Sequence, residues 1–151
     1  MIAGHTVRMQ MLIGATPDVV FPFLTDPELY ARWQGVRAEL DPRPGGVYRV
    51  WMDGDSVASG AFVEVEPPRL VVFTWGWEGD TEVPPGSTTV RVELVATGDD
   101  TTLTLEHSGL PSDRAAAMHE EGWRLFTSRL ATVATGGDPG PMPPPPASAP
   151  A

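Results

Sequence analysis

The chain of 151 residues contains no cysteine, and its ten basic residues are all arginine, so it also lacks lysine. Without cysteine, disulfides, thiolate metal sites and cysteine nucleophiles are excluded. Positive charge is scarce as well, because twenty acidic residues outnumber the arginines and leave a formal net charge of −10. Nucleic acids and anionic membrane surfaces both require clustered positive charge, so neither is an expected partner.

Long apolar segments are also missing. No stretch approaches the roughly 20 apolar residues of a membrane-spanning helix, and the first ten residues lack the basic and apolar regions of a signal peptide. We therefore expect a cytoplasmic protein without membrane insertion. The length fits one domain, and 41% hydrophobic residues are enough for a packed core.

The most informative segment is 66–77, EPPRLVVFTWGW. Two prolines precede a run of β-branched and aromatic residues that is apolar on both faces. Because side chains alternate along a strand, Phe73, Trp75 and Trp77 share one face. Three large aromatic side chains at this spacing indicate a strand that lines a core or an apolar cavity.

The remaining patterns predict an order of elements. Residues 5–13 alternate as a strand does, and Thr16-Pro17 and Asp26-Pro27 are start signals of two short helices. Period-two patterning then predicts further strands over 36–40, 47–52, 57–65, 69–77, 88–96 and 101–107. In the segment 57–65, Val57, Ala61, Val63 and Val65 recur in phase and are expected to share one face.

Residues 112–135 are predicted to form one long helix. Apolar residues recur there at spacings of three and four, the pattern of a helix with one buried face. Antiparallel strands followed by this helix predict an α+β fold in which a curved sheet of about six to seven strands wraps around the helix. The Pro/Ala-rich remainder, 138–151, is expected to be a disordered tail, which leaves 1–137 as the domain.

Several short motifs occur in order between about residues 5 and 135: Ala15-Thr16-Pro17, Thr25–Leu29, Arg32-Trp33, Pro44-Gly45-Gly46, Glu66–Leu70, Phe73-Thr74-Trp75 and Gly122-Trp123. Their order resembles the SRPBCC superfamily, also called START-like or Bet v 1-like, which has a helix-grip fold. Within it, the chain is similar to the Hsp90-ATPase-activator-homologue-like family of bacterial single-domain proteins. The resemblance implies a hydrophobic pocket between the sheet and the long helix, but it does not imply one activity.

Ten residues are expected to contact a ligand in this pocket: Tyr48, Met52, Phe73, Trp75, Trp77, Leu105, His107, Met118, His119 and Trp123. They are aromatic or apolar side chains from both layers, with the two histidines as polar anchors. The loop 78–87, rich in glycine, proline and acids, is expected to form a mobile rim. Neither Glu120-Glu121 nor Asp53-Gly54-Asp55 has the spacing of a zinc or calcium site, so no metal and no cofactor is expected.

The sequence leaves three functions open. The first is binding of a small apolar ligand under the long helix. The second is a cyclase- or hydratase-like enzyme with His107 or His119 as acid or base, although no convergent acid, base and oxyanion-binding group supports it and no catalytic residue is assigned. The third is a co-chaperone-like interaction module with a protein partner, and the choice between monomer and homodimer stays open.

Overall fold

The computed structural model describes residues 5–53 and 55–141. Its elements are β1 (His5–Ile13), α1 (Pro17–Val20), α2 (Pro22–Thr25), α3 (Pro27–Tyr30), β2 (Arg37–Leu40), β3 (Val47–Trp51), β4 (Val57–Glu66), β5 (Leu70–Trp75), β6 (Thr88–Thr97), β7 (Asp100–Leu110) and α4 (Asp113–Ala134). The strands form one antiparallel sheet in the order β1-β7-β6-β5-β4-β3-β2. The predicted α+β helix-grip architecture is confirmed.

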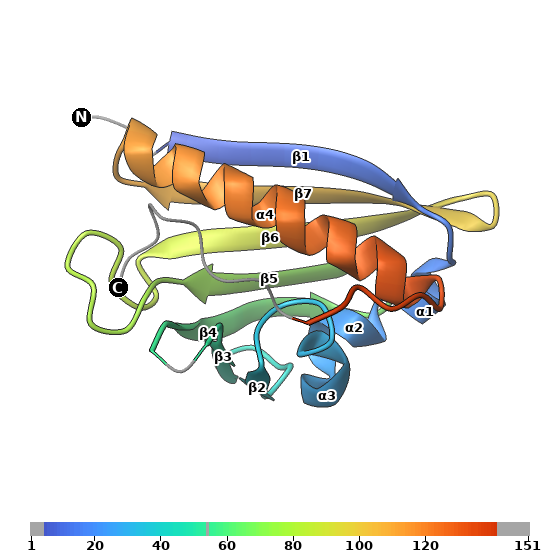
Figure 1. The fold of residues 1–151 in the computed structure, drawn as a ribbon, viewed down its shortest axis with the longest axis horizontal. Coiled ribbons are helices and arrows are strands. Elements are labelled where there is room, and N and C mark those ends of the chain that lie inside the picture. Colours follow the sequence, from blue (N-terminus) through green and yellow to red (C-terminus); the bar gives the residue numbers. More distant parts are fainter. Residues whose placement is uncertain (1–4, 54, 142–151) are drawn as a thin grey trace.

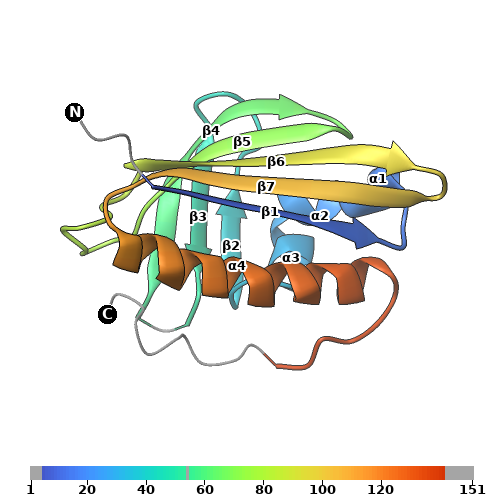
Figure 2. The same ribbon diagram turned by 90° about the horizontal axis from the view of Figure 1, so that it is seen from above.

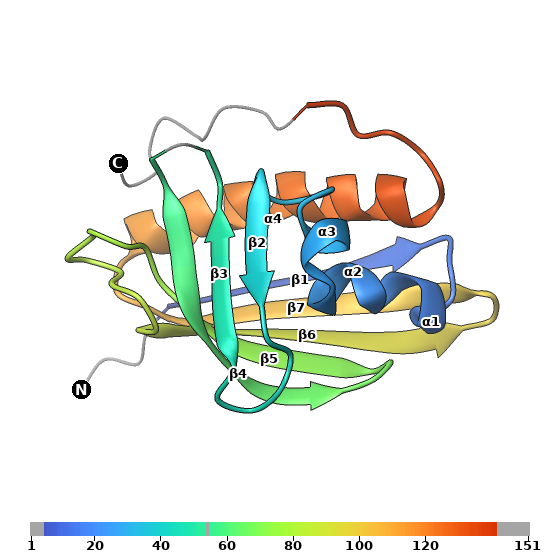
Figure 3. The same cartoon turned by 90° about the horizontal axis from the view of Figure 1, so that it is seen from below.

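The long helix α4 lies across one face of the sheet (Figure 1). Seen from above, α4 runs alongside β1, and the short helix α3 lies near its second half (Figure 2). Seen from below, β2, β3 and β4 run steeply across the direction of β6 and β7, because the sheet is strongly curved (Figure 3). The core lies between this curved sheet, α4 and the short helices. None of the helices within the described ranges has the length and apolar character needed to cross a membrane.

The segment after β1 forms three short helices instead of two. Pro22 has no N–H with which to continue the hydrogen-bond ladder of α1, and a separate helix, α2, begins at this residue. Asp26 caps the start of α3, as expected from the sequence. Its Oδ1 accepts hydrogen bonds from the N–H groups of Glu28 and Leu29 at 2.9 and 3.2 Å. Thr16 occupies the cap position of α1 but makes no side-chain capping bond.

The buried side chains of β4 are not the ones that recur in phase in the sequence. Ala58 and Phe62 are buried, whereas Val63 is 47% exposed, so Val57, Ala61, Val63 and Val65 do not form one buried face. The pairing with β5 shifts register between Phe62 and Glu64, which marks an irregularity of the bulge type. Both alternating sets of this strand contain apolar residues, so the period alone could not determine which set faces inward.

The chain turns back on α4 after the helix ends. Gly136 has a φ of +89°, and the N–H groups of Gly136 and Gly137 donate to the carbonyls of Val133 and Thr132. This closure of the last turn is a common way to end a helix. It carries residues 138–141 back over Arg129. The guanidinium of Arg129 donates hydrogen bonds to the carbonyls of residues 139–141. The rest of the expected tail, 142–151, lies outside the described residues.

Candidate functional site in the core under the long helix

All ten predicted site residues are buried. Seven of them form one group of touching rings, which we call the aromatic cluster: Tyr48, Phe73, Trp75, Trp77, His107, His119 and Trp123. Met52 and Leu105 belong to the same contiguous hydrophobic core. Met118 is also buried, but it is not a member of that core.

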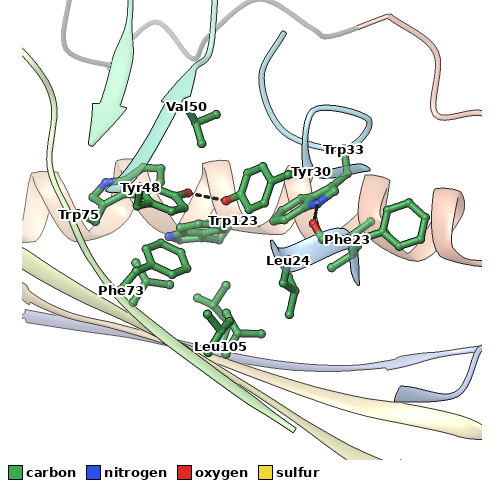
Figure 4. Close-up of a cluster of buried hydrophobic side chains, with 14 of the residues drawn as sticks. Phe23, Leu24, Tyr30, Trp33, Tyr48, Val50, Phe73, Trp75, Leu105 and Trp123 are labelled. Atoms are coloured by element: carbon green, nitrogen blue, oxygen red, sulfur yellow. Dashed lines mark hydrogen bonds between the residues drawn. The ribbon is translucent and has the colours of Figure 1, made fainter. Parts of the chain in front are cut away.

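Trp75 lies at the centre of the aromatic cluster. Strand β5 turns Phe73 and Trp75 inward, and the indole of Trp75 lies 5.2 Å from the ring of Trp123 and 5.3 Å from that of Trp77. Tyr48 from β3 stacks on Phe73 at 4.0 Å. Figure 4 shows Tyr48, Phe73, Trp75 and Trp123 facing one another between the strands and α4. The rings are in contact, so a ligand here would have to part them.

His107 is held by hydrogen bonds at both ring nitrogens. The hydroxyl of Thr88 donates to the carbonyl of Trp75 at 2.8 Å, so its oxygen must accept the hydrogen of His107 Nε2, also at 2.8 Å. His107 Nδ1 then accepts the indole N–H of Trp123 at 2.9 Å. This network assigns His107 as a neutral imidazole with its hydrogen on Nε2.

His119 has the opposite tautomer. Its Nε2 accepts the indole N–H of Trp77 at 3.0 Å, and its Nδ1 donates to the carbonyl of Ala115, one turn earlier on α4, at 2.7 Å. The two imidazole rings meet edge to face, with centroids 4.9 Å apart. Each histidine therefore serves as the hydrogen-bond acceptor of a tryptophan from another element of the fold.

The environment keeps both histidines neutral. Burial lowers the pKa of His107 well below its ordinary value, and the neighbouring His119 lowers it further. Burial also lowers the pKa of His119, although the carbonyl of Ala115 and the charges of Asp80 and Glu82 act in the opposite direction. An added proton on either ring would face an indole N–H instead of an acceptor. All four imidazole nitrogens are thus engaged, which leaves no lone pair for acid–base chemistry in this arrangement.

Sequence reasoning missed a second buried polar group beside the cluster. Tyr48 donates its hydroxyl hydrogen to Tyr30, and Tyr30 donates to Oε1 of Gln34, each at 2.5 Å. Burial raises the pKa of both tyrosines, so the hydroxyls stay protonated. The spacing of four between Tyr30 and Gln34 was visible in the sequence, but only the fold brings Tyr48 onto them. Figure 4 shows the contact between the two tyrosines.

One polar atom of the cluster has no partner among the described residues. The indole nitrogen Nε1 of Trp75 is a buried donor without a hydrogen-bond acceptor. Trp77 and Trp123 both donate to histidines, and Trp33 donates to the carbonyl of Phe23. Buried donors are nearly always paired, so the indole of Trp75 is the exception in this core that needs an explanation.

The loop 78–87 closes one end of the cluster and is held at several points. Val83 is buried in the core, and its carbonyl accepts the N–H of Trp77 at 2.7 Å. Glu78 forms a two-bond ion pair with Arg49 at 2.7 and 2.8 Å. The loop that was expected to form a mobile rim is held by these contacts, and access to Trp77 from this side requires the loop to move.

The comparisons with known proteins agree with this architecture. A curved antiparallel sheet that grips a long C-terminal helix is the fold of the SRPBCC, or Bet v 1-like, superfamily. Residues 14–135 match the family model described as Activator of Hsp90 ATPase homolog 1-like protein. The chain belongs to this family, as the motifs indicated. A search of curated proteins found no match.

Solved structures extend the comparison. An AHSA1-like protein from Rhizobium etli is 46% identical, with 93% of this chain and 88% of that one covered and a TM-score of 0.74. DynU16, a protein of the dynemicin biosynthetic locus, is 28% identical with a TM-score of 0.78; the match covers 89% of this chain and 48% of DynU16. An Hsp90 activator from Plasmodium falciparum is 22% identical, with coverages of 87% and 97% and a TM-score of 0.72, which shows a shared fold.

Proposed function

We propose that the aromatic cluster binds a small, neutral and mostly apolar molecule that carries a hydrogen-bond acceptor. The observation that carries this proposal is the buried indole N–H of Trp75, which has no acceptor among the described residues. Leaving such a donor unpaired costs about 1–3 kcal/mol, and a ligand carbonyl or ether oxygen would recover it.

The chemistry of the walls selects a neutral molecule. The cluster contains no carboxylate or guanidinium, and burial lowers the pKa of both of its histidines. A charged ligand would lose its hydration here without gaining a counter-ion. An aromatic ligand, in contrast, would meet the faces and edges of five large aromatic side chains. If it buried about 300 Å² of apolar surface, it would gain roughly 7 kcal/mol, against at least about 4 kcal/mol for association.

The same hydrogen bonds favour binding over catalysis. A general acid or base needs a ring nitrogen within reach of the substrate. Both ring nitrogens of His107 are hydrogen-bonded, to Thr88 and Trp123. Both ring nitrogens of His119 are hydrogen-bonded as well, to Ala115 and Trp77. The cyclase- or hydratase-like alternative would require these bonds to break first. The similarity to an Hsp90 activator, at 22% identity, supports the fold alone. It does not identify a surface through which the interaction-module alternative would bind a protein partner.

A matched pair of ligands tests the proposal. Fluorene and fluorenone have the same tricyclic shape, but only fluorenone carries a carbonyl acceptor. We expect both to bind saturably in calorimetric titrations, with fluorenone tighter by about tenfold because it pairs the indole N–H of Trp75. Trp75→Phe should remove this preference, and Trp51→Phe, on a strand face outside the cluster, should keep it. Absence of binding by both compounds would contradict the proposed function.

A further inference from the structure

A second pocket lies away from the aromatic cluster, where the turn after α3 meets the end of α4. Its volume is about 580 Å³, within the usual range of small-molecule sites. The turn after α3 lines it with Ala31, Arg32, Gly35 and Val36. The other walls are Arg129 and Val133 of α4 and the returning segment 136–140. No residue of the aromatic cluster lines it, so an occupant of this pocket would touch none of the rings that a core ligand would contact.

The wall of this pocket contains a buried cation. This cation is Arg129, which is only 9% exposed. Its Nε donates to the carbonyl of Trp33 at 3.0 Å. The two Nη atoms donate to the carbonyls of Pro139, Gly140 and Pro141 at 3.0–3.3 Å. These four bonds leave one of the five N–H groups of the guanidinium, on Nη2, without a partner among the described residues.

Carbonyl groups accept hydrogen bonds from four of the five N–H groups of Arg129 but do not neutralise its charge. Buried charges are normally paired with an opposite charge, yet Arg129 belongs to none of the ion pairs within the described ranges. Arg32, which is exposed and also lines the pocket, likewise belongs to none of these ion pairs. Asp138 is the single carboxylate in the lining, and its Oδ1 accepts the N–H of Gly140.

The charge of the pocket is therefore opposite to that of the chain. Two arginines and one aspartate give the lining a formal charge of +1, whereas the whole chain carries −10. The carbonyls at the end of α4, which would repel an anion, are partly covered because those of Val133 and Thr132 accept hydrogen bonds from Gly136 and Gly137. Val36 and Val133 add apolar surface beside the two guanidinium groups.

We propose that this pocket is a second ligand site, which binds a small organic carboxylate. The carboxylate would accept hydrogen bonds from Arg32 and from the remaining N–H of Arg129, because a planar guanidinium matches the geometry of a carboxylate. The apolar body of the acid would lie against Val36 and Val133. The returning segment 138–140 forms one wall, so the site depends on the main-chain bonds that Arg129 makes to it.

The test uses benzoate and its uncharged isostere benzamide. Four glycines line the pocket, Gly35, Gly136, Gly137 and Gly140, and glycine amide signals are well separated in a ¹H–¹⁵N spectrum. We expect benzoate to shift the signals of these glycines saturably, and benzamide to leave them in place. The indole N–H signals of the aromatic cluster should not move with benzoate, which separates this site from the core site.

Two substitutions with opposite expected effects locate the carboxylate. Arg32→Gln should weaken benzoate binding about tenfold, because one charge-assisted contact is lost. Asp138→Asn should strengthen it severalfold, because a like charge is removed. Arg114→Gln, an exposed arginine at the other end of α4, is the matched control and should have no effect. The proposal is overturned if benzoate shifts none of the four glycines, if benzamide binds equally well, or if Arg32→Gln and Arg114→Gln behave alike.

Discussion

Trp123 on α4 donates its indole N–H to Nδ1 of His107 on β7, and this 2.9 Å hydrogen bond joins the two layers of the fold inside the core. The helix therefore docks on the sheet by a directed polar contact as well as by apolar packing. The hydrogen bond also determines the tautomer of His107, and through it the direction of the bonds to Thr88 and Trp75.

Truncation of Trp123 should strongly destabilise the protein. Trp123→Ala removes a side chain that is 2% exposed, and we expect the free energy of unfolding in urea to fall by about 3–5 kcal/mol. Trp123→Phe keeps much of the ring packing but leaves His107 Nδ1 without its donor, so it should cost about 1–3 kcal/mol. A loss below about 1 kcal/mol for Trp123→Ala would mean that the helix does not dock through this residue.

Mild acid should destabilise the fold through the two buried histidines. Their pKa values are lowered in the folded state, so the unfolded chain binds more protons once the pH falls below about 6.5. The free energy of unfolding should then decrease as the pH falls from about 6.5, by up to about 1.4 kcal/mol per pH unit for each histidine. A flat profile between pH 7 and pH 5 would contradict the neutral assignment.

Two glycines should respond to alanine in opposite directions. A Cβ on Gly60 would lie 2.0 Å from the main-chain oxygen of Thr74 on the adjacent strand, so Gly60→Ala should cost about 1–3 kcal/mol or more. A Cβ on Gly122 would meet only Phe126, at 3.8 Å, within a regular helix. Gly122→Ala should therefore stabilise the protein by about 0.5–1 kcal/mol. Thermal unfolding of the two variants measures both effects, and a stabilising Gly60→Ala would show that β4 and β5 are not so closely paired.

Removal of residues beyond Gly137 should lower stability. The sequence alone predicts no effect, because the Pro/Ala-rich segment has no apolar anchor. In the structure, that truncation removes three carbonyls from the guanidinium of Arg129, which would cost about 1–3 kcal/mol. A chain that ends at Met142 keeps all three as peptide carbonyls and is the control. Equal melting temperatures for the two truncated chains would show that the contacts do not contribute.

The aromatic strand could be predicted from its run of β-branched and aromatic residues. The long helix could be predicted from its spacings of three and four, which place Trp123, Leu130 and Val133 inside. Trp77 and His119 could both be placed inside, but their mutual hydrogen bond could not, because it depends on how the helix rotates on the sheet. The exposure of Val63 could not be predicted, because a register shift in β4 interrupts the alternation. The contact of Arg129 with residues 139–141 could not be foreseen, since it arises only when the chain reverses at Gly136.

The indole N–H signal of Trp75 offers the most direct test of the proposed ligand site. Trp75→Phe assigns this signal in the ¹H–¹⁵N spectrum, because it is the one that disappears. Addition of fluorenone should move it to the position of a hydrogen-bonded donor, fluorene should cause a smaller shift, and the signal of Trp51 should stay in place. If the Trp75 signal is unaffected by fluorenone at concentrations that saturate binding, the acceptor does not reach this indole and the proposed site is wrong.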